Sequence, residues 1–123
     1  ENELSRYIVH AAYEVHKQLG PGLLESVYLN CLMHELLSED IYVVKQQSLP
    51  VVYKDVKLDC GFRLDLWVEN KVIIEVKAVE TLTDVHMAQI LTYLKLTNNR
   101  LGFLINFNVA LIKNGIKRIA NGI

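Results

Sequence analysis

The sequence has no excess of charge of either sign. Lys and Arg number 13 and Asp and Glu number 14, so the 123 residues carry a formal net charge of −1. This balance argues against a protein that coats nucleic acid through its overall charge, because such proteins are strongly basic. Contact with nucleic acid would need a local patch of positive charge. The C-terminal third has a basic bias that would either bind phosphates or form an ordinary solvated surface: Lys95, Arg100, Lys113, Lys117 and Arg118.

Cysteine and long apolar runs are also scarce. The two cysteines, Cys31 and Cys60, lie in apolar segments without motif spacing. We therefore expect both to be buried free thiols in a reducing cytoplasm. No apolar run reaches the ~18 residues that a membrane-spanning helix needs, and no signal-peptide pattern opens the sequence. These absences predict a cytoplasmic protein with no membrane partner.

Two common site motifs are missing as well. The sequence GPG at residues 20–22 lacks the Lys-Ser/Thr pair that a P-loop requires. The four histidines show no metal-ligand spacing, such as a pair at i and i+4 accompanied by a Glu. Neither a P-loop nor a histidine-based metal site is therefore indicated.

The sequence contains enough hydrophobic residues to form a core. Hydrophobic residues make up 51% of the chain, which fits one domain over residues 1–123. Apolar residues at helical spacing predict three helices, over residues 3–19, 23–38 and 83–97. Thr83 is a suitable N-cap for the last of them. In the second helix, the predicted apolar face includes Leu24, Val27 and Leu37.

The remaining segments have the composition of strands. β-Branched and aromatic runs predict strands in residues 41–54, with a break near Pro50, and over 56–69, 71–79 and 101–107. The tail should add a hairpin or a short strand that turns at Asn114-Gly115. No repeat or linker is present, so the expected fold class is α/β, with one mixed central sheet flanked by helices.

Two of the predicted strands carry charge in a matching pattern. In residues 62–68 and 72–78 the even positions are apolar, and we expect them to share one buried face. The odd positions include Asp65 in the first strand, and Glu75 and Lys77 in the second. A hairpin brings these polar faces together only if its loop has an odd number of residues, and a loop of three satisfies this. Asp65 then faces Glu75 directly.

Two carboxylates that face each other across a strand pair repel, and a cation between them would remove the conflict. Their oxygens suit a hard ion such as Mg²⁺ or Mn²⁺. Lys77, beside Glu75, would orient an attacking water and stabilise charge in a phosphodiester-cleaving transition state. The alternative is a solvated strand face, where Glu-x-Lys is common. Arg63, opposite Lys77, would contact a phosphate or pair with a carboxylate, and the structural pairing is the favoured role.

The arrangement of Asp65, Glu75 and Lys77 resembles the signature of the PD-(D/E)XK nuclease superfamily. More narrowly, GLLESVY resembles the motif of the GxxExxY family, with its three defining positions filled by Gly22, Glu25 and Tyr28. The blocks GFRLDLWVENKVIIEVKAVE, QILTYLKL and RLGFLINF are similar too, so the resemblance covers residues 7–122. One departure is Leu64, which stands where the superfamily name has Pro.

The resemblance implies a restriction-endonuclease-like core and a Mg²⁺- or Mn²⁺-dependent nuclease acting on DNA or RNA. It implies that Asp65 and Glu75 hold the metal. Glu25 would assist them as a metal ligand or catalytic residue, and Lys77 and Gln89 would act in catalysis. The residues expected to bind substrate are Arg63 and Tyr93.

Each added residue also has a simpler explanation. Glu25 would be favoured in the first turn of a helix by the helix dipole alone. Gln89 and Tyr93, at i and i+4, would form the polar edge of a half-buried helix. Tyr28 is expected to pack in the core with its hydroxyl hydrogen-bonded.

Two functions other than a nuclease stay open at this point. One is a non-catalytic module that binds nucleic acid or nucleotides on the same fold, although the intact acids and Lys77 argue against a decayed site. The other is an assembly subunit in which the first helix or the C-terminal strand forms a dimer. A homodimer would also help so small a domain to hold nucleic acid.

Overall fold

The computed structural model describes residues 2–122, apart from the side chain of Cys60. Two helices come first, α1 (Asn2–Leu19) and α2 (Glu25–Ser38), followed by the strands β1 (Val43–Tyr53), β2 (Val56–Val68) and β3 (Val72–Lys77). Then come α3 (Asp84–Thr97), β4 (Leu101–Asn106), the short 3-10 helix η1 (Ile112–Asn114) and β5 (Ile116–Ala120). The order and approximate bounds of the predicted elements are therefore confirmed.

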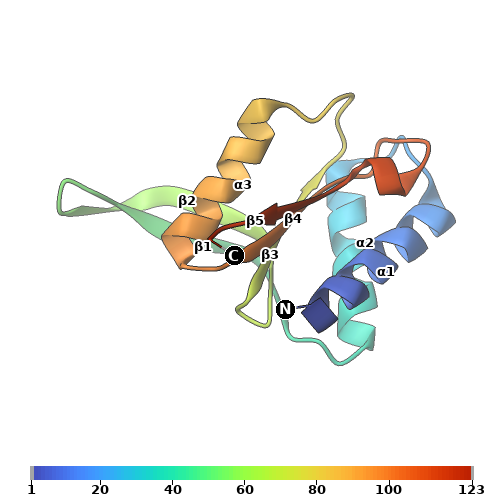
Figure 1. Ribbon diagram of the computed structural model, residues 1–123, viewed down its shortest axis with the longest axis horizontal. Coiled ribbons are helices and arrows are strands. Elements are labelled where there is room, and N and C mark those ends of the chain that lie inside the picture. Colours follow the sequence, from blue (N-terminus) through green and yellow to red (C-terminus); the bar gives the residue numbers. More distant parts are fainter. Residues whose placement is uncertain (1, 123) are drawn as a thin grey trace.

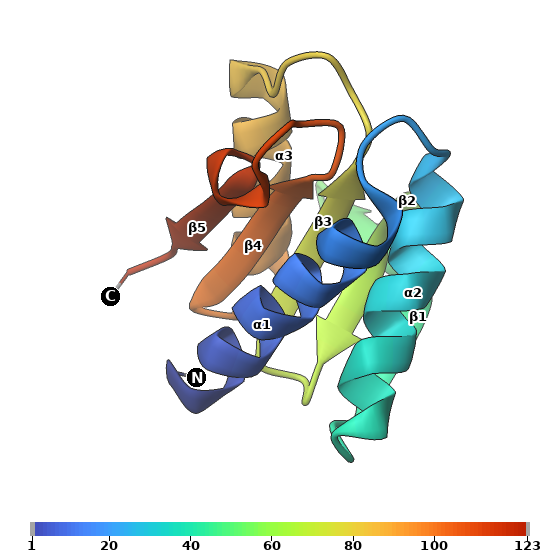
Figure 2. The same cartoon turned by 90° about the vertical axis from the view of Figure 1, so that its right-hand side faces the viewer.

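The five strands form one mixed sheet in the order β1-β2-β3-β4-β5. Neighbouring strands are antiparallel except β3 and β4, which are parallel and are joined through α3. Helices α1 and α2 cover one face of the sheet and α3 covers the other (Figures 1 and 2). This is the mixed sheet flanked by helices that the sequence predicted. Figure 1 also shows the ribbon of β1 and β2 extending past α3.

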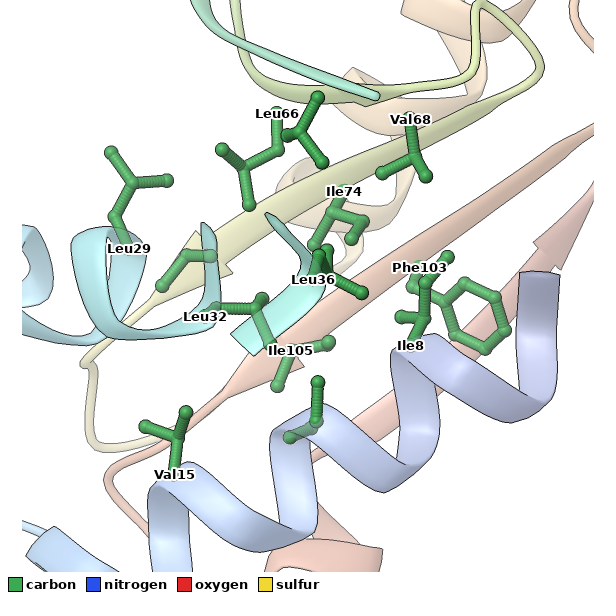
Figure 3. Close-up of a cluster of buried hydrophobic side chains, with 14 of the residues drawn as sticks. Ile8, Val15, Leu29, Leu32, Leu36, Leu66, Val68, Ile74, Phe103 and Ile105 are labelled. Atoms are coloured by element: carbon green, nitrogen blue, oxygen red, sulfur yellow. The ribbon is translucent and has the colours of Figure 1, made fainter. Parts of the chain in front are cut away.

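The larger core lies between the sheet and the first two helices. Helix α1 buries Ile8, Ala11, Ala12 and Val15, whose spacing places them on one side of the helix. Figure 3 shows the labelled side chains of this core from α1, α2 and the sheet: Ile8, Val15, Leu29, Leu32, Leu36, Leu66, Val68, Ile74, Phe103 and Ile105. Burial of these side chains fixes both helices against β3 and β4.

A smaller core holds α3 on the opposite face. It consists of Leu64, Ile73, Ile90, Leu94 and Leu104. The helix begins at the predicted cap, Thr83, whose side chain accepts a hydrogen bond from the backbone of His86. The sheet therefore has helices packed on both faces, and side chains from either layer can reach the end of β3.

The predicted apolar face of the second helix is partly wrong. Leu24 precedes the helix and is 75% exposed, while Val27 and Leu37 are also exposed. Tyr28 is buried instead, together with Leu29, Leu32 and Leu36. The helix is apolar on several sides, and only the sheet decides which side is covered.

The prediction that side chains alternate regularly along β2 is also partly wrong. The even positions of residues 62–68 do not share one face, because Leu66 packs in the core under α1 and α2 whereas Leu64 packs under α3. The change occurs at Asp65. Across from it in β1 lies Gln46, which adopts a left-handed conformation with φ of 54°. Regular alternation therefore ends where the candidate site begins.

Pro50 does not end a strand. Strand β1 continues through it with a shift of register between Leu49 and Val51. The shift needs a glycine opposite, because a Cβ at Gly61 would collide with the carbonyl oxygen of Leu49. The predicted break is thus an irregularity within one long ribbon.

The other sequence predictions have mixed outcomes. The tail forms the short strand β5 after a turn at Asn114 and Gly115, not a separate hairpin. Cys31 is a free thiol but only half-buried, and the side chain of Cys60 lies outside what the structure describes. Within the described residues, no helix combines the length and apolar character needed to cross a membrane.

Candidate active site

The turn between β2 and β3 sets the register of the two acids. Val68 pairs with Val72, and Leu66 pairs with Ile74. This leaves a three-residue loop, as predicted, and the next opposed positions in the same register are Asp65 and Glu75. The predicted loop length and register of this hairpin are therefore confirmed.

The two carboxylates bridge the strands at the point where the regular ladder stops. The backbone N–H of Asp65 donates to Oε2 of Glu75 at 2.9 Å. The backbone N–H of Val76 donates to Oδ2 of Asp65 at 2.8 Å. Each acid thus satisfies a backbone donor of the opposite strand with one oxygen.

Burial raises the pKa of both acids. Glu75 is only 3% exposed, and its burial together with the nearby Asp65 carboxylate raises its pKa from 4.5 to about 8. Burial also raises the pKa of Asp65, although the backbone N–H of Val76 and the cations of Lys77 and Arg63 oppose the rise. The pair therefore holds more negative charge than its surroundings stabilise, so it favours either a proton or a cation.

A glycine-containing loop positions Glu25 close to this pair. Glu25 is the first residue of α2, and its negative charge is among the causes that raise the pKa of Glu75. The preceding loop turns through Gly22, whose φ of 98° is easily adopted only by glycine. Glu25 itself is exposed. The structure therefore brings the charge of Glu25 within electrostatic reach of Glu75 and leaves Glu25 exposed.

Tyr28 stabilises this loop from within the core. Its hydroxyl donates to the carbonyl of Gly20 at 2.6 Å and accepts from the N–H of Leu23 at 3.0 Å. Its ring is fully buried and stacks on Phe107 with 4.7 Å between ring centroids. The predicted packing role of Tyr28 is confirmed. The tyrosine ties the loop before Glu25 to the end of β4.

Helix α3 contributes two polar side chains from the opposite side. Burial raises the pKa of Tyr93, and the charges of Glu75 and Asp65 raise it further, whereas a hydrogen bond with Gln89 lowers it. The Tyr93 ring stacks on Phe62 at 4.7 Å. Both predicted residues of α3 therefore lie in the electrostatic neighbourhood of the acids. Arg63 is exposed and acts on the pKa of Asp65.

Comparison with known proteins agrees with this geometry. A family model of the PD-(D/E)XK nuclease superfamily matches residues 2–119. The chain belongs to the PD-(D/E)XK nuclease superfamily. Searches of curated proteins and of solved structures found no match. The restriction-endonuclease-like fold class predicted from the sequence is thus confirmed, and nucleases of this superfamily generally use divalent metals.

The donor set of this superfamily member fits a hard divalent cation. Asp65 and Glu75 could supply oxygen ligands from adjacent strands, and burial, which raises the pKa of both, disfavours their ionised forms unless positive charge is nearby. Among the described residues, no three His, Cys, Asp or Glu side chains form a ready ligand cluster. Mg²⁺ tolerates this, because it keeps several waters and is held by one or two carboxylates.

One structural residue of the site was missed by the sequence reasoning. Asn106 is only 2% exposed and lies across from Lys77 in the parallel pair β3-β4. Its amide accepts from the N–H of Val79 at 3.1 Å and donates to the carbonyl of Val79 at 2.9 Å. It therefore fixes the chain just after Lys77. The available signal was a single amide in the otherwise apolar run LGFLINF.

Proposed function

We propose that this protein is a divalent-metal-dependent nuclease that hydrolyses a phosphodiester bond of nucleic acid. The observation that carries the proposal is the pair of facing carboxylates, Asp65 and Glu75, with raised pKa values and with Lys77 two residues beyond Glu75. Superfamily membership supports this chemistry. A single catalytic domain over residues 1–123 and a cytoplasmic location are parts of the same proposal.

The proposal extends to the GxxExxY family. In support, the three defining residues share one task in the fold. Gly22 permits the turn, Tyr28 hydrogen-bonds the loop, and the loop delivers Glu25 toward Glu75. The loop before α2 would then require the spacing of these three residues at i, i+3 and i+6.

Asp65 and Glu75 would hold the metal through the oxygens that the strand contacts leave over, with Glu25 assisting directly or through water. When bound, a divalent cation would offset the charge of the carboxylates and polarise a phosphate oxygen. Lys77, half-buried at the end of β3, would orient the attacking water and stabilise negative charge that develops on the phosphate. Asn106 would keep the end of that strand in place.

The residues of α3 and the exposed arginine would act on the substrate. Gln89 would position water or Lys77, and its hydrogen bond with Tyr93 limits the freedom of both side chains. Tyr93, stacked on Phe62, would present its hydroxyl beside the acids. Arg63 would contact a phosphate of the substrate next to the one that is cleaved.

A cleavage assay with Mg²⁺ or Mn²⁺ tests the proposal on single-stranded, duplex and branched DNA and RNA. We expect metal-dependent cleavage by the wild type. Asp65→Asn and Lys77→Ala should each abolish it. The matched controls Asp59→Asn and Lys71→Ala change exposed residues of the same types and should retain activity. Binding without cleavage by the wild type would replace this proposal with a non-catalytic binding module.

A further inference from the structure

An open groove runs along α1 on the face of the sheet that α1 and α2 cover. Its larger part, about 770 Å³, is lined by Arg6, His10 and Tyr13 of α1 and by Phe103, Ile116 and Arg118 of the sheet. Figure 2 shows α1 crossing the sheet beside β4, with β5 at the edge. The groove thus lies between a helix and the edge strand of the sheet.

A second hollow of about 390 Å³ continues the groove toward the C-terminal end of α1. It is lined by Tyr13 and Lys17 of α1 and by the segment 110–113, which includes Lys113. Because Tyr13 lines both hollows, we treat them as one surface, the α1 groove. A ring nitrogen of His16 lies 2.7 Å from the carbonyl oxygen of Val109, which joins α1 to the loop that forms the far wall.

Charge in the α1 groove is segregated. Four exposed cations line it, namely Arg6, Lys17, Lys113 and Arg118, whereas neither hollow is lined by an Asp or Glu among the described residues. The chain as a whole has more acidic than basic residues. A neighbouring hollow with two acids, Glu3 and Glu39, borders the groove beside Arg6. The groove therefore concentrates positive charge that the chain as a whole does not have.

The groove also has apolar and aromatic surface. Val9 and Ile116, both half-buried, line the larger hollow together with Tyr13, whose side chain is 45% exposed. A single nucleic-acid strand combines regularly spaced phosphates with flat bases that stack on such side chains. Arg6 and Lys17 are eleven positions apart on one helix, a span of ~16 Å that covers more than one phosphate.

The direction of the groove suits a substrate strand of the proposed nuclease. Strands β3 and β4 are parallel, so they end at the same edge of the sheet, where Lys77 lies opposite Asn106. Val109, which contacts His16, follows Asn106 by only three residues. The end of the groove with Lys17 and Lys113 therefore lies near the edge of the sheet where β3 ends at Lys77.

We propose that the α1 groove binds a single-stranded segment of nucleic acid next to the bond that is cleaved. This inference rests on the proposed nuclease function for the identity of the anion.

Fluorescence anisotropy with labelled 12-nucleotide DNA and RNA single strands, in EDTA, tests the groove without cleavage. The double substitution Arg6→Gln/Arg118→Gln should weaken binding about tenfold near 0.15 M salt and reduce the slope of log K against log salt by about 1.4, the value for two lost phosphate contacts. Lys17→Gln/Lys113→Gln, in the second hollow, should have a similar effect. All four residues are exposed, and melting temperatures would verify folding.

The matched control is Lys95→Gln/Arg100→Gln, which removes two exposed cations that do not line the groove. Equal weakening by the control, no binding by the wild type, or no effect of either groove variant would overturn the proposal. Poly-glutamate that competes equally well and depends on the same residues would replace it with an acidic-peptide groove. Metal-dependent cleavage by the wild type is measured separately, so the catalytic proposal and the groove proposal fail independently.

Discussion

Removing the charge of Glu75 should stabilise the metal-free protein at alkaline pH. Because the pKa of Glu75 is raised to about 8, its carboxyl stays protonated in the folded state over a range in which the unfolded chain has already ionised. The folded state binds more protons there, so the free energy of unfolding decreases as pH rises from 4.5 through 8. Glu75→Gln cannot ionise and should lose this dependence.

The interval from 4.5 to about 8 sets the size of the effect. At ~1.4 kcal/mol for each pH unit, the upper limit is about 5 kcal/mol, of which about 3 kcal/mol falls between pH 6 and pH 9. At pH 6 the wild-type carboxyl is protonated and the variant amide has nearly the same shape. The amide oxygen can still accept from the N–H of Asp65. We therefore expect similar stabilities at pH 6 and a more stable variant at pH 9.

Urea denaturation in EDTA at pH 6, 7, 8 and 9 measures the difference directly. The control Glu39→Gln makes the same substitution at an exposed position and should follow the wild-type curve. Parallel curves for wild type and Glu75→Gln over this range would refute the reasoning, because they would show that Glu75 ionises alike in the folded and unfolded chains.

Three further changes test the surroundings of the acids. Mg²⁺ at 100-fold above its Kd should stabilise the wild type at pH 8 by about 2.7 kcal/mol, and Asp65→Asn should abolish this rise in Tm; an equal rise in the variant would place the ion elsewhere. Tyr28→Phe removes two loop hydrogen bonds and should cost about 1–3 kcal/mol in urea denaturation while lowering cleavage; unchanged cleavage would show that the loop does not position Glu25. Gly61→Ala should lower Tm by several degrees, because its Cβ would meet the backbone of β1; an unchanged Tm would contradict the close packing at this position.

The facing acids were predictable because the rule behind them is geometric. The loop length of a hairpin determines which residues of the two strands lie opposite each other, and a loop of three places Asp65 opposite Glu75. The rule needed no knowledge of the rest of the fold. Regular alternation failed one residue earlier, at Leu64, where the side chains change face opposite the left-handed Gln46 of another strand. No glycine marks that position in the sequence.

The remaining misses concern contacts between distant segments. Leu24 and Val27 are apolar but exposed, because the sheet covers only one side of α2. The α1 groove was predicted only in part for a similar reason: Lys113 and Arg118 belong to the basic bias seen in the sequence, whereas Arg6 and Lys17 do not. Arg6 and Arg118 come from opposite ends of the chain, and only the pairing of β5 with β4 brings them to one groove. Composition reports the sum of charges, whereas a groove depends on where the fold places them.

The hydrogen bonds of the two acids raise the question of whether their role is only structural. Each carboxylate accepts a hydrogen bond from one backbone N–H at the point where the ladder between β2 and β3 ends, so each has a structural role. Asn and Gln would accept the same bonds without burying charge. The chain instead carries two acids whose ionised forms destabilise the fold, with a third, Glu25, adding to the repulsion. Such an arrangement has no advantage for stability alone. A cation bound between the acids would offset their charge, and such a cation is what the proposed nuclease requires.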